Sequence, residues 1–120
     1  MKYVRLHIGK DGKTHFEDAT LSLEEADYRP PAPLVFVSHT YQTDGLQFIR
    51  LPSGWAAKVI NPPKKQFLIG LKGTIEVTVS DGETRSFGAG DRILMEDVEG
   101  DGHATRVMGD EFLAAVVPID

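Results

Sequence analysis

Residues 66–91 read QFLIGLKGTIEVTVSDGETRSFGAGD, and they give the strongest indication of the fold class of the chain. In residues 74–79, isoleucine and valine alternate with threonine and glutamate, which is the period of a strand with one buried and one solvated face. The sequence SDGE at residues 80–83 then has the composition of a tight hairpin turn. We therefore expect antiparallel β-structure through this region.

The same pattern extends outward to both ends of the chain, with turn residues about every 8–12 positions, the spacing of a sandwich or barrel. Residues 3–8 and 14–21 are expected to form an N-terminal hairpin. Residues 22–27 can form one short helical turn, because Ser22 stands three positions before Glu25 as in a capping box. The segment RPPAP at residues 29–33 is expected to be an extended arm that wraps the barrel. Further strands are expected at residues 34–40, 46–51, 55–60, 66–72, 74–80, 84–87, 92–96, 103–107 and 112–117.

Composition favours one globular domain, since the chain has 120 residues, of which 41% are hydrophobic and 26% charged. The absence of cysteine indicates a reducing compartment, and the N-terminus has no continuous apolar stretch of the signal-peptide kind, so a cytoplasmic protein is expected. The net charge of -5 argues against nucleic acid as a partner, and no apolar run is long enough to predict a membrane contact.

Residues 62–73, 80–83 and 87–91 together resemble the core of a small cupin. The first cupin motif reads G-x5-H-x-H-x3-4-E-x6-G, and the spacing from Gln66 to Gly73 matches its last part with glutamine in place of glutamate. The second motif reads G-x5-P-x-G-x2-H-x3-N, and it begins well at Gly90. The resemblance implies an all-β fold, a jelly-roll or double-stranded β-helix barrel, with an N-terminal hairpin and arm at residues 1–33 packing on a barrel at residues 34–120.

The same resemblance implies that the usual cupin metal ligands are missing. The two histidine positions of the first motif fall on Val59 and Asn61, or on Ile60 and Pro62 with the shorter spacer. In the second motif a longer loop delivers His103, and valine stands at the asparagine position. We therefore expect neither a metal nor another cofactor. Residues 95–106 and 14–18 also resemble a subgroup of short, functionally uncharacterised bacterial cupins.

The motif alignment points Gln66 and His103 into the barrel, where an unpaired polar group would be costly. They are expected to face each other, either in a structural hydrogen bond or as groups that meet a ligand. Period-2 alternation adds neighbours on the same faces. The candidate ligand-binding residues are Trp55, Val59, Asn61, Gln66, Leu68, Thr105, Val107 and His15, with His103 as the candidate catalytic acid or base.

Three other features have a functional and a structural interpretation. His7, His15 and His39 could join His103 in a relocated metal site, although no ligand-like spacing supports it. Lys64 and Lys65 could attract an anion to the barrel mouth, or simply be solvated. The acidic residues 96–101 could bind a hard cation, but they lack the calcium-loop pattern, so a solvated turn is expected.

The sequence thus favours a barrel that binds a small, partly apolar organic molecule without metal and acts through His103 if it is an enzyme. The alternative is a metal-dependent oxygenase, isomerase or lyase with a non-standard ligand set. A regulatory module is the third possibility. A homodimer is expected, because the N-terminal hairpin and proline arm could complete the sheet of a second copy.

Overall fold

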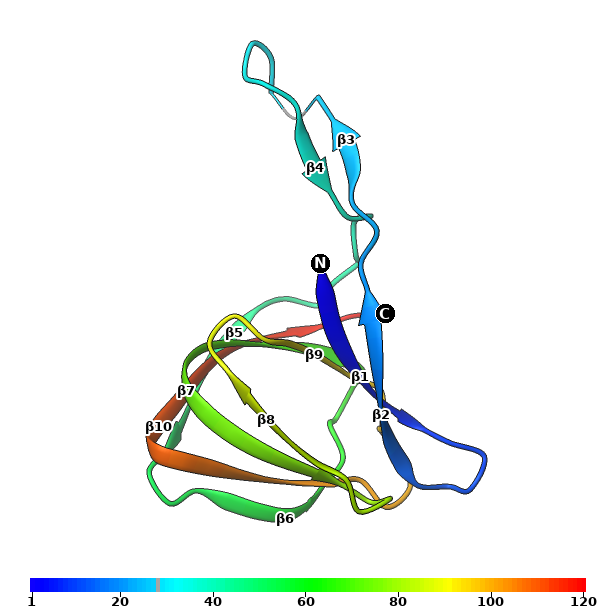
Figure 1. Cartoon of the computed structure of the whole chain (residues 1–120), viewed down its shortest axis with the longest axis vertical. Helices are drawn as coiled ribbons and strands as arrows, with labels where there is room; N and C mark the ends of the chain where they lie inside the picture. The colour runs from blue at the N-terminus through cyan, green and yellow to red at the C-terminus, as the bar shows by residue number, and fades with distance from the viewer. Residues whose placement is uncertain (28) are drawn as a thin grey trace.

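The computed structural model describes residues 1–27 and 29–120, and the regular structure of this part consists of strands. One sheet has the order β2-β1-β9-β7-β10-β5, with β6 also paired to β10 and β8 to β7, and it curls into a barrel (Figure 1). The predicted all-β barrel is therefore confirmed. The described residues contain no helix that is long and apolar enough to cross a membrane. The strands are β1 (Lys2–Ile8), β2 (Thr14–Thr20), β3 (Glu24–Ala26), β4 (Val35–Val37), β5 (Gln47–Pro52), β6 (Ala56–Ile60), β7 (Gln66–Val79), β8 (Thr84–Gly88), β9 (Arg92–Met95) and β10 (His103–Pro118).

The two long strands β7 and β10 are each continuous where the sequence predicted two strands. Gly73 lies at the bend of β7 with φ 84°, and Gly109 lies in β10 with φ 78°, a backbone region that glycine adopts without strain. The register between the two strands shifts between Met108 and Leu113, which marks a bulge. The bends let the first half of β7 pair with β9 and the second half with β8.

The N-terminal hairpin is confirmed, because β1 and β2 pair antiparallel from Lys2↔Thr20 to Ile8↔Thr14. It is also an integral part of the barrel sheet, since β1 pairs in parallel with β9 at Val4↔Ile93. Leu6 of this hairpin is fully buried in the main core. The hairpin thus completes the sheet and the core of its own barrel.

Residues 21–40 differ from the prediction, because they contain a second, separate hairpin. β3 pairs with β4, and the proline segment forms its tip, where the Ala32 amide donates to the Arg29 carbonyl at 2.9 Å. Figure 1 shows this hairpin projecting away from the barrel. The expected helical turn, the wrapping arm and a barrel strand at residues 34–40 are therefore wrong, and the expected boundary at residue 33 falls inside the hairpin. One helical turn is costly to nucleate, whereas the apolar residues 35–37 offer a strand partner.

The main hydrophobic core fills the barrel with side chains from both walls. Its fully buried members include Leu6, Ile75, Val77, Ile93 and Phe112. A second, smaller cluster of Phe67, Leu94 and Ile119 lies on the opposite face of β7 and β9, because successive strand residues point to opposite sides. The core leaves room for a cavity near the start of β7 and β10.

Candidate functional site

The barrel contains a cavity of about 200 Å³ whose wall is mainly apolar. Polar side chains enter this wall at Gln66, His103 and Thr105. Such a combination of apolar walls and a few polar groups is typical of small-molecule sites. The wall is made by Ile49, Leu51, Trp55, Ile60, Pro62, Pro63, Gln66, Leu68, Ile75, Met95, His103, Thr105 and Val116.

Strand pairing places the polar wall residues. His103 is the first residue of β10, where it pairs with Ile60 of β6 and Val79 of β7. Gln66 is the first residue of β7 and pairs with Met95 of β9. Because the side chains of a strand alternate between faces, Thr105 shares the face of His103, and Leu68 shares that of Gln66.

His103 forms a buried pair with Asp97, which the sequence analysis did not identify as a site residue. The two side chains meet at 2.6 Å between Nδ1 and Oδ2, and Asp97 and His103 are 0% and 3% exposed. The Thr14 hydroxyl donates to the same Oδ2 at 3.3 Å. Asp97 Oδ1 is buried without a hydrogen-bond partner among the described residues. The prediction of a solvated acidic turn is therefore wrong for Asp97, because the loop folds this one carboxylate inward against the imidazole.

The loop that carries Asp97 is fixed to the end of β6. The Asn61 amide donates to the carbonyl oxygens of Asp97 at 2.9 Å and Glu99 at 3.0 Å. Gly102 has φ 66°, and a Cβ there would lie 2.4 Å from the Ile60 carbonyl oxygen, so the backbones approach too closely for a side chain. Asn61 is exposed and holds the loop, so its expected place in the wall is corrected to a structural one.

The pairing with Asp97 determines what His103 can offer to the cavity. An ionised carboxylate only accepts hydrogen bonds, so a neutral imidazole that pairs with it through Nδ1 carries its hydrogen on that nitrogen. Nε2 then keeps its lone pair and can accept a hydrogen bond or a proton. Among the described residues, no hydrogen bond joins Gln66 to His103, and the imidazole is bonded to Asp97 instead. Of the two alternatives for Gln66 and His103, the structural bond between them is therefore not observed.

The wall contains five of the predicted residues and excludes others. Trp55, Gln66, Leu68, His103 and Thr105 all line the cavity. Val107 is buried in the core but does not line the cavity, and Val59 is 71% exposed on the outside.

The error at Val59 has a physical reason in the pairing of β6 with β10. His103 pairs with Ile60, but Thr105 pairs with Ala57, so β6 contains one residue more than its partner over this interval. Such a bulge breaks the alternation that starts at Trp55. Ile60 therefore points inward where Val59 was expected, and Pro62 follows it into the wall.

His15 lies outside the cavity, on the β1–β2 hairpin, and the expectation that it lines the ligand site is corrected. Its Nε2 lies 2.9 Å from Asp11 Oδ1, and its Nδ1 lies 2.8 Å from Asp81 Oδ2. The hydrogen bond to Asp11 raises the pKa of His15, and Asp81 adds to this effect while partial desolvation opposes it. The His7 ring lies 5.9 Å from the His15 ring, and His39 stacks on Tyr41. Each of these three histidines therefore has other partners, and they do not come together with His103 in one site.

The cavity also tests whether the chain fits the metal that a cupin-like barrel implies. With the shorter motif spacer, the four ligand positions are Ile60, Pro62, Gln66 and His103, and all four line the cavity. Of these side chains only the imidazole is a usual transition-metal donor, and Gln66 adds a neutral amide. The described residues contain no group of three or more His, Asp or Glu side chains that could hold a metal ion. The donor set does not fit such a metal.

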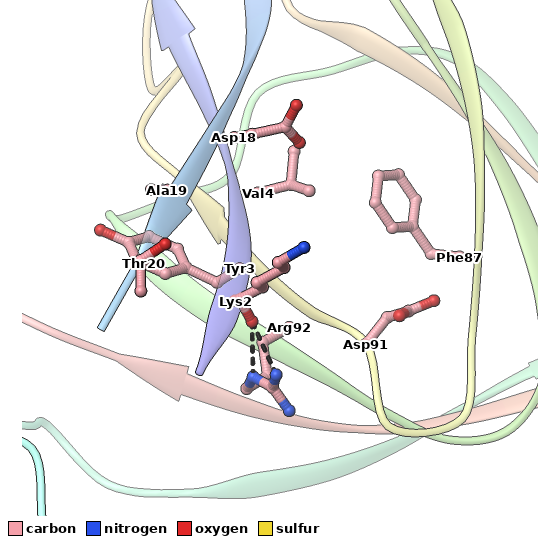
Figure 2. Close-up of a pocket in the computed structure, with 9 residues that line it drawn as sticks. All are labelled: Lys2, Tyr3, Val4, Asp18, Ala19, Thr20, Phe87, Asp91 and Arg92. Atoms are coloured by element: carbon pink, nitrogen blue, oxygen red, sulfur yellow. Dashed lines mark hydrogen bonds between the residues drawn. The ribbon is translucent and has the colours of Figure 1, made fainter. Parts of the chain in front are cut away.

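A larger cleft of about 440 Å³ lies outside the barrel between the β1–β2 hairpin and β8 (Figure 2). Its charged groups Arg92 and Asp91 bond to the protein itself. Arg92 donates from Nη2 and Nε to the Lys2 carbonyl at 2.6 and 3.0 Å, and the Gly88 amide donates to Asp91 at 2.7 Å. These groups hold the hairpin and a turn in place, so we assign the candidate site to the barrel cavity.

Comparisons with known proteins leave the function of this chain open. No family model matches the sequence, and no curated protein matches it. Similar solved structures include a conserved protein of unknown function from Streptococcus pyogenes, with 19% identity over 71% of this chain and 69% of that one and a TM-score of 0.48. They also include a cupin 2 conserved barrel domain protein from Salinispora arenicola, with 18% identity over 96% and 81% and a TM-score of 0.48. The Cnp3 cupin domain of Schizosaccharomyces pombe has 15% identity over 100% and 83% and a TM-score of 0.47.

The observed strands thus define an all-β barrel with a buried His–Asp pair at its cavity. Two of these three similar structures are described as cupin domains. Likeness at this level assigns no function to this chain.

Proposed function

We propose that the barrel cavity binds a small, partly apolar organic molecule directly, without a bound metal ion, through the imidazole of His103. The observation that carries the proposal is the 2.6 Å contact between His103 Nδ1 and Asp97 Oδ2 at the wall of an otherwise apolar cavity. The carboxylate orients the ring and leaves Nε2 for a ligand.

The chemistry of the wall limits the ligand. A cavity of about 200 Å³ holds a small molecule only, and its apolar side chains favour a compact hydrocarbon or aromatic part. The polar atoms of Gln66, His103 and Thr105 penalise ligands that leave them unpaired. The ligand therefore carries a hydroxyl, carbonyl or carboxyl group next to its apolar part.

The same arrangement supports acid–base chemistry as an extension of binding. A neutral imidazole whose Nδ1–H is held by Asp97 can accept a proton at Nε2 from a ligand hydroxyl or an acidic C–H group. Asp97 would stabilise the resulting imidazolium. In this role His103 is the catalytic residue, and Asp97 is a positioning residue.

The test is a thermal-shift screen of small hydroxy, keto and carboxylic acids, followed by calorimetric titration of every hit. Gln66→Leu removes a polar wall group and leaves the His103–Asp97 pair intact, so it is expected to weaken binding about tenfold or more, the effect of one unpaired polar contact. Val59→Ala, at an exposed position outside the wall, is the matched control and should bind normally. Full affinity of folded Gln66→Leu and His103→Ala variants for every hit would place the site elsewhere.

A further inference from the structure

We infer that the projecting β3–β4 hairpin is an exchange arm that packs on the outer surface of strand β5 in a second copy of this chain. The hairpin is two strands of three residues each, and a two-stranded ribbon of this kind is marginal in water when nothing covers it. Figure 1 shows it standing clear of the barrel. Its stability therefore calls for a partner surface.

One face of the arm is apolar and exposed. Glu25 pairs with Phe36, so these two side chains share a face, and alternation places Leu23 and Leu34 on the same face. Phe36 is 62% exposed, and Leu23 and Leu34 are also exposed. Three large apolar side chains around one carboxylate form a compact docking face.

The barrel has a matching apolar surface on β5. Ile49 and Leu51 point into the cavity, so the alternate residues Leu46, Phe48 and Arg50 point outward. Phe48 is 72% exposed, and Leu46 is exposed as well. In the part of the chain that the structure describes, β5 pairs only with β10 and ends the sheet, which leaves an edge that proteins ordinarily protect.

Charge supports the pairing of these two surfaces. Glu25 gives the docking face of the arm a negative charge, whereas the outward face beside Phe48 carries Arg50. Lys72 of β7 lies across the intervening β10, where both cations are opposite Leu113. Glu111 lies between these two cations, 2.7 Å from Arg50 and 3.2 Å from Lys72, which leaves a net positive charge. An arm glutamate can therefore approach the cations while its apolar neighbours contact Leu46 and Phe48.

The occupant is a second copy because one chain presents both halves of the contact, and its own arm points away from its barrel. Two copies related by a two-fold axis can exchange arms so that both contacts form and the assembly closes. This inference is independent of the proposed ligand site. It also changes the elements expected to dimerise, since the β1–β2 hairpin is already part of its own sheet.

The first test is sedimentation velocity of the full chain and of three single variants between about 1 and 100 µM. The wild type should be a dimer at the upper concentrations. Phe36→Asp in the arm and Phe48→Asp on β5 should each weaken the dimer at least about thirtyfold, as expected for a buried aromatic contact. Val59→Asp, at an equally exposed apolar position on β6, is the control and should leave the dimer unchanged. A monomeric wild type at about 100 µM, or dimers unaffected by both aspartates, would overturn the inference.

The second test identifies the contact, and it uses the absence of native cysteine. Single variants Phe36→Cys and Phe48→Cys are mixed, allowed to exchange and treated with a short bismaleimide. An arm-to-β5 contact gives the mixed 36–48 product, which is necessarily between two chains. If the protein is a dimer but links only 48 to 48, the faces of two barrels meet instead and the arm assignment is wrong.

Discussion

The buried His103–Asp97 pair allows a thermodynamic test of the site through apolar replacement. His103→Leu leaves the Asp97 carboxylate buried, with the Thr14 hydroxyl as its remaining hydrogen-bond donor. Asp97→Leu leaves the imidazole buried without its acceptor. The double variant removes both polar groups and keeps similar side-chain volume.

The structure gives the order of the three effects. Both side chains are essentially inaccessible to water, so breaking the pair from the histidine side should cost about 3–5 kcal/mol in the free energy of unfolding. Removing Asp97 leaves a neutral N–H group unpaired, which costs about 1–3 kcal/mol. The double variant should lie within about 2 kcal/mol of the wild type, because a buried polar pair is often replaceable by apolar groups of similar volume.

Urea unfolding followed by the fluorescence of the single tryptophan, Trp55, measures all four proteins. With a slope of about 2 kcal/mol per M, His103→Leu should lower the midpoint by about 2 M. The exposed Arg106–Glu76 pair is the control, since Arg106→Leu should cost less than about 1 kcal/mol. If His103→Leu costs no more than this control, or if the double variant is the least stable protein, the buried-pair reasoning is refuted.

Three further predictions concern other parts of the molecule. Gly70→Ala should lower the free energy of unfolding by about 1–3 kcal/mol in the same urea assay, because the Cβ of the alanine would lie 2.2 Å from the Gly88 carbonyl oxygen. An unchanged urea midpoint would contradict this close packing. NMR titration should place the pKa of His15 above 6.5, and this pKa should be lower in the Asp11→Asn variant. Because folding raises the pKa of His15, its contribution to stability is present below pH 6.5 and is lost as the pH rises through the pKa of the folded protein. Elemental analysis should find no stoichiometric transition metal, whereas one zinc, iron, nickel or manganese per chain surviving mild chelation would favour the metal-dependent alternative.

The sequence predicted the barrel strands well because their alternation is regular and turn residues separate them. It failed where tertiary packing decides between local alternatives. Gly73 reads as a strand end, yet in the barrel it lets β7 bend and continue. Residues 22–27 carry a helix-capping pattern, yet the apolar segment at residues 35–37 provides a strand partner.

The sequence predicted the polar wall residues of the candidate site, but it misplaced Val59 and missed Asp97. The resemblance to the cupin motifs, with a longer loop before His103, placed His103 and Gln66 in the wall, and alternation added Leu68 and Thr105. A bulge in β6 is invisible to alternation, so Val59 was expected where Ile60 lies. Asp97 was missed because it stands in an acidic run, and it turns inward through long-range contacts such as those of Asn61 with the loop backbone and of Thr14 with its carboxylate. A signal was present in the glycines that follow, since two of them at positions 100 and 102 indicate a tightly turned loop.

The central claim is that a small ligand contacts Nε2 of His103 while Asp97 holds Nδ1. The most direct measurement is NMR of the imidazole nitrogens in protein labelled with ¹⁵N-histidine, recorded before and after each hit of the thermal-shift screen is added. The account predicts that the Nε2 resonance of His103 shifts on saturation, that Nδ1 stays protonated, and that the exposed His39 does not respond. Ligands that stabilise the protein but leave both ring nitrogens of His103 unchanged would contradict it.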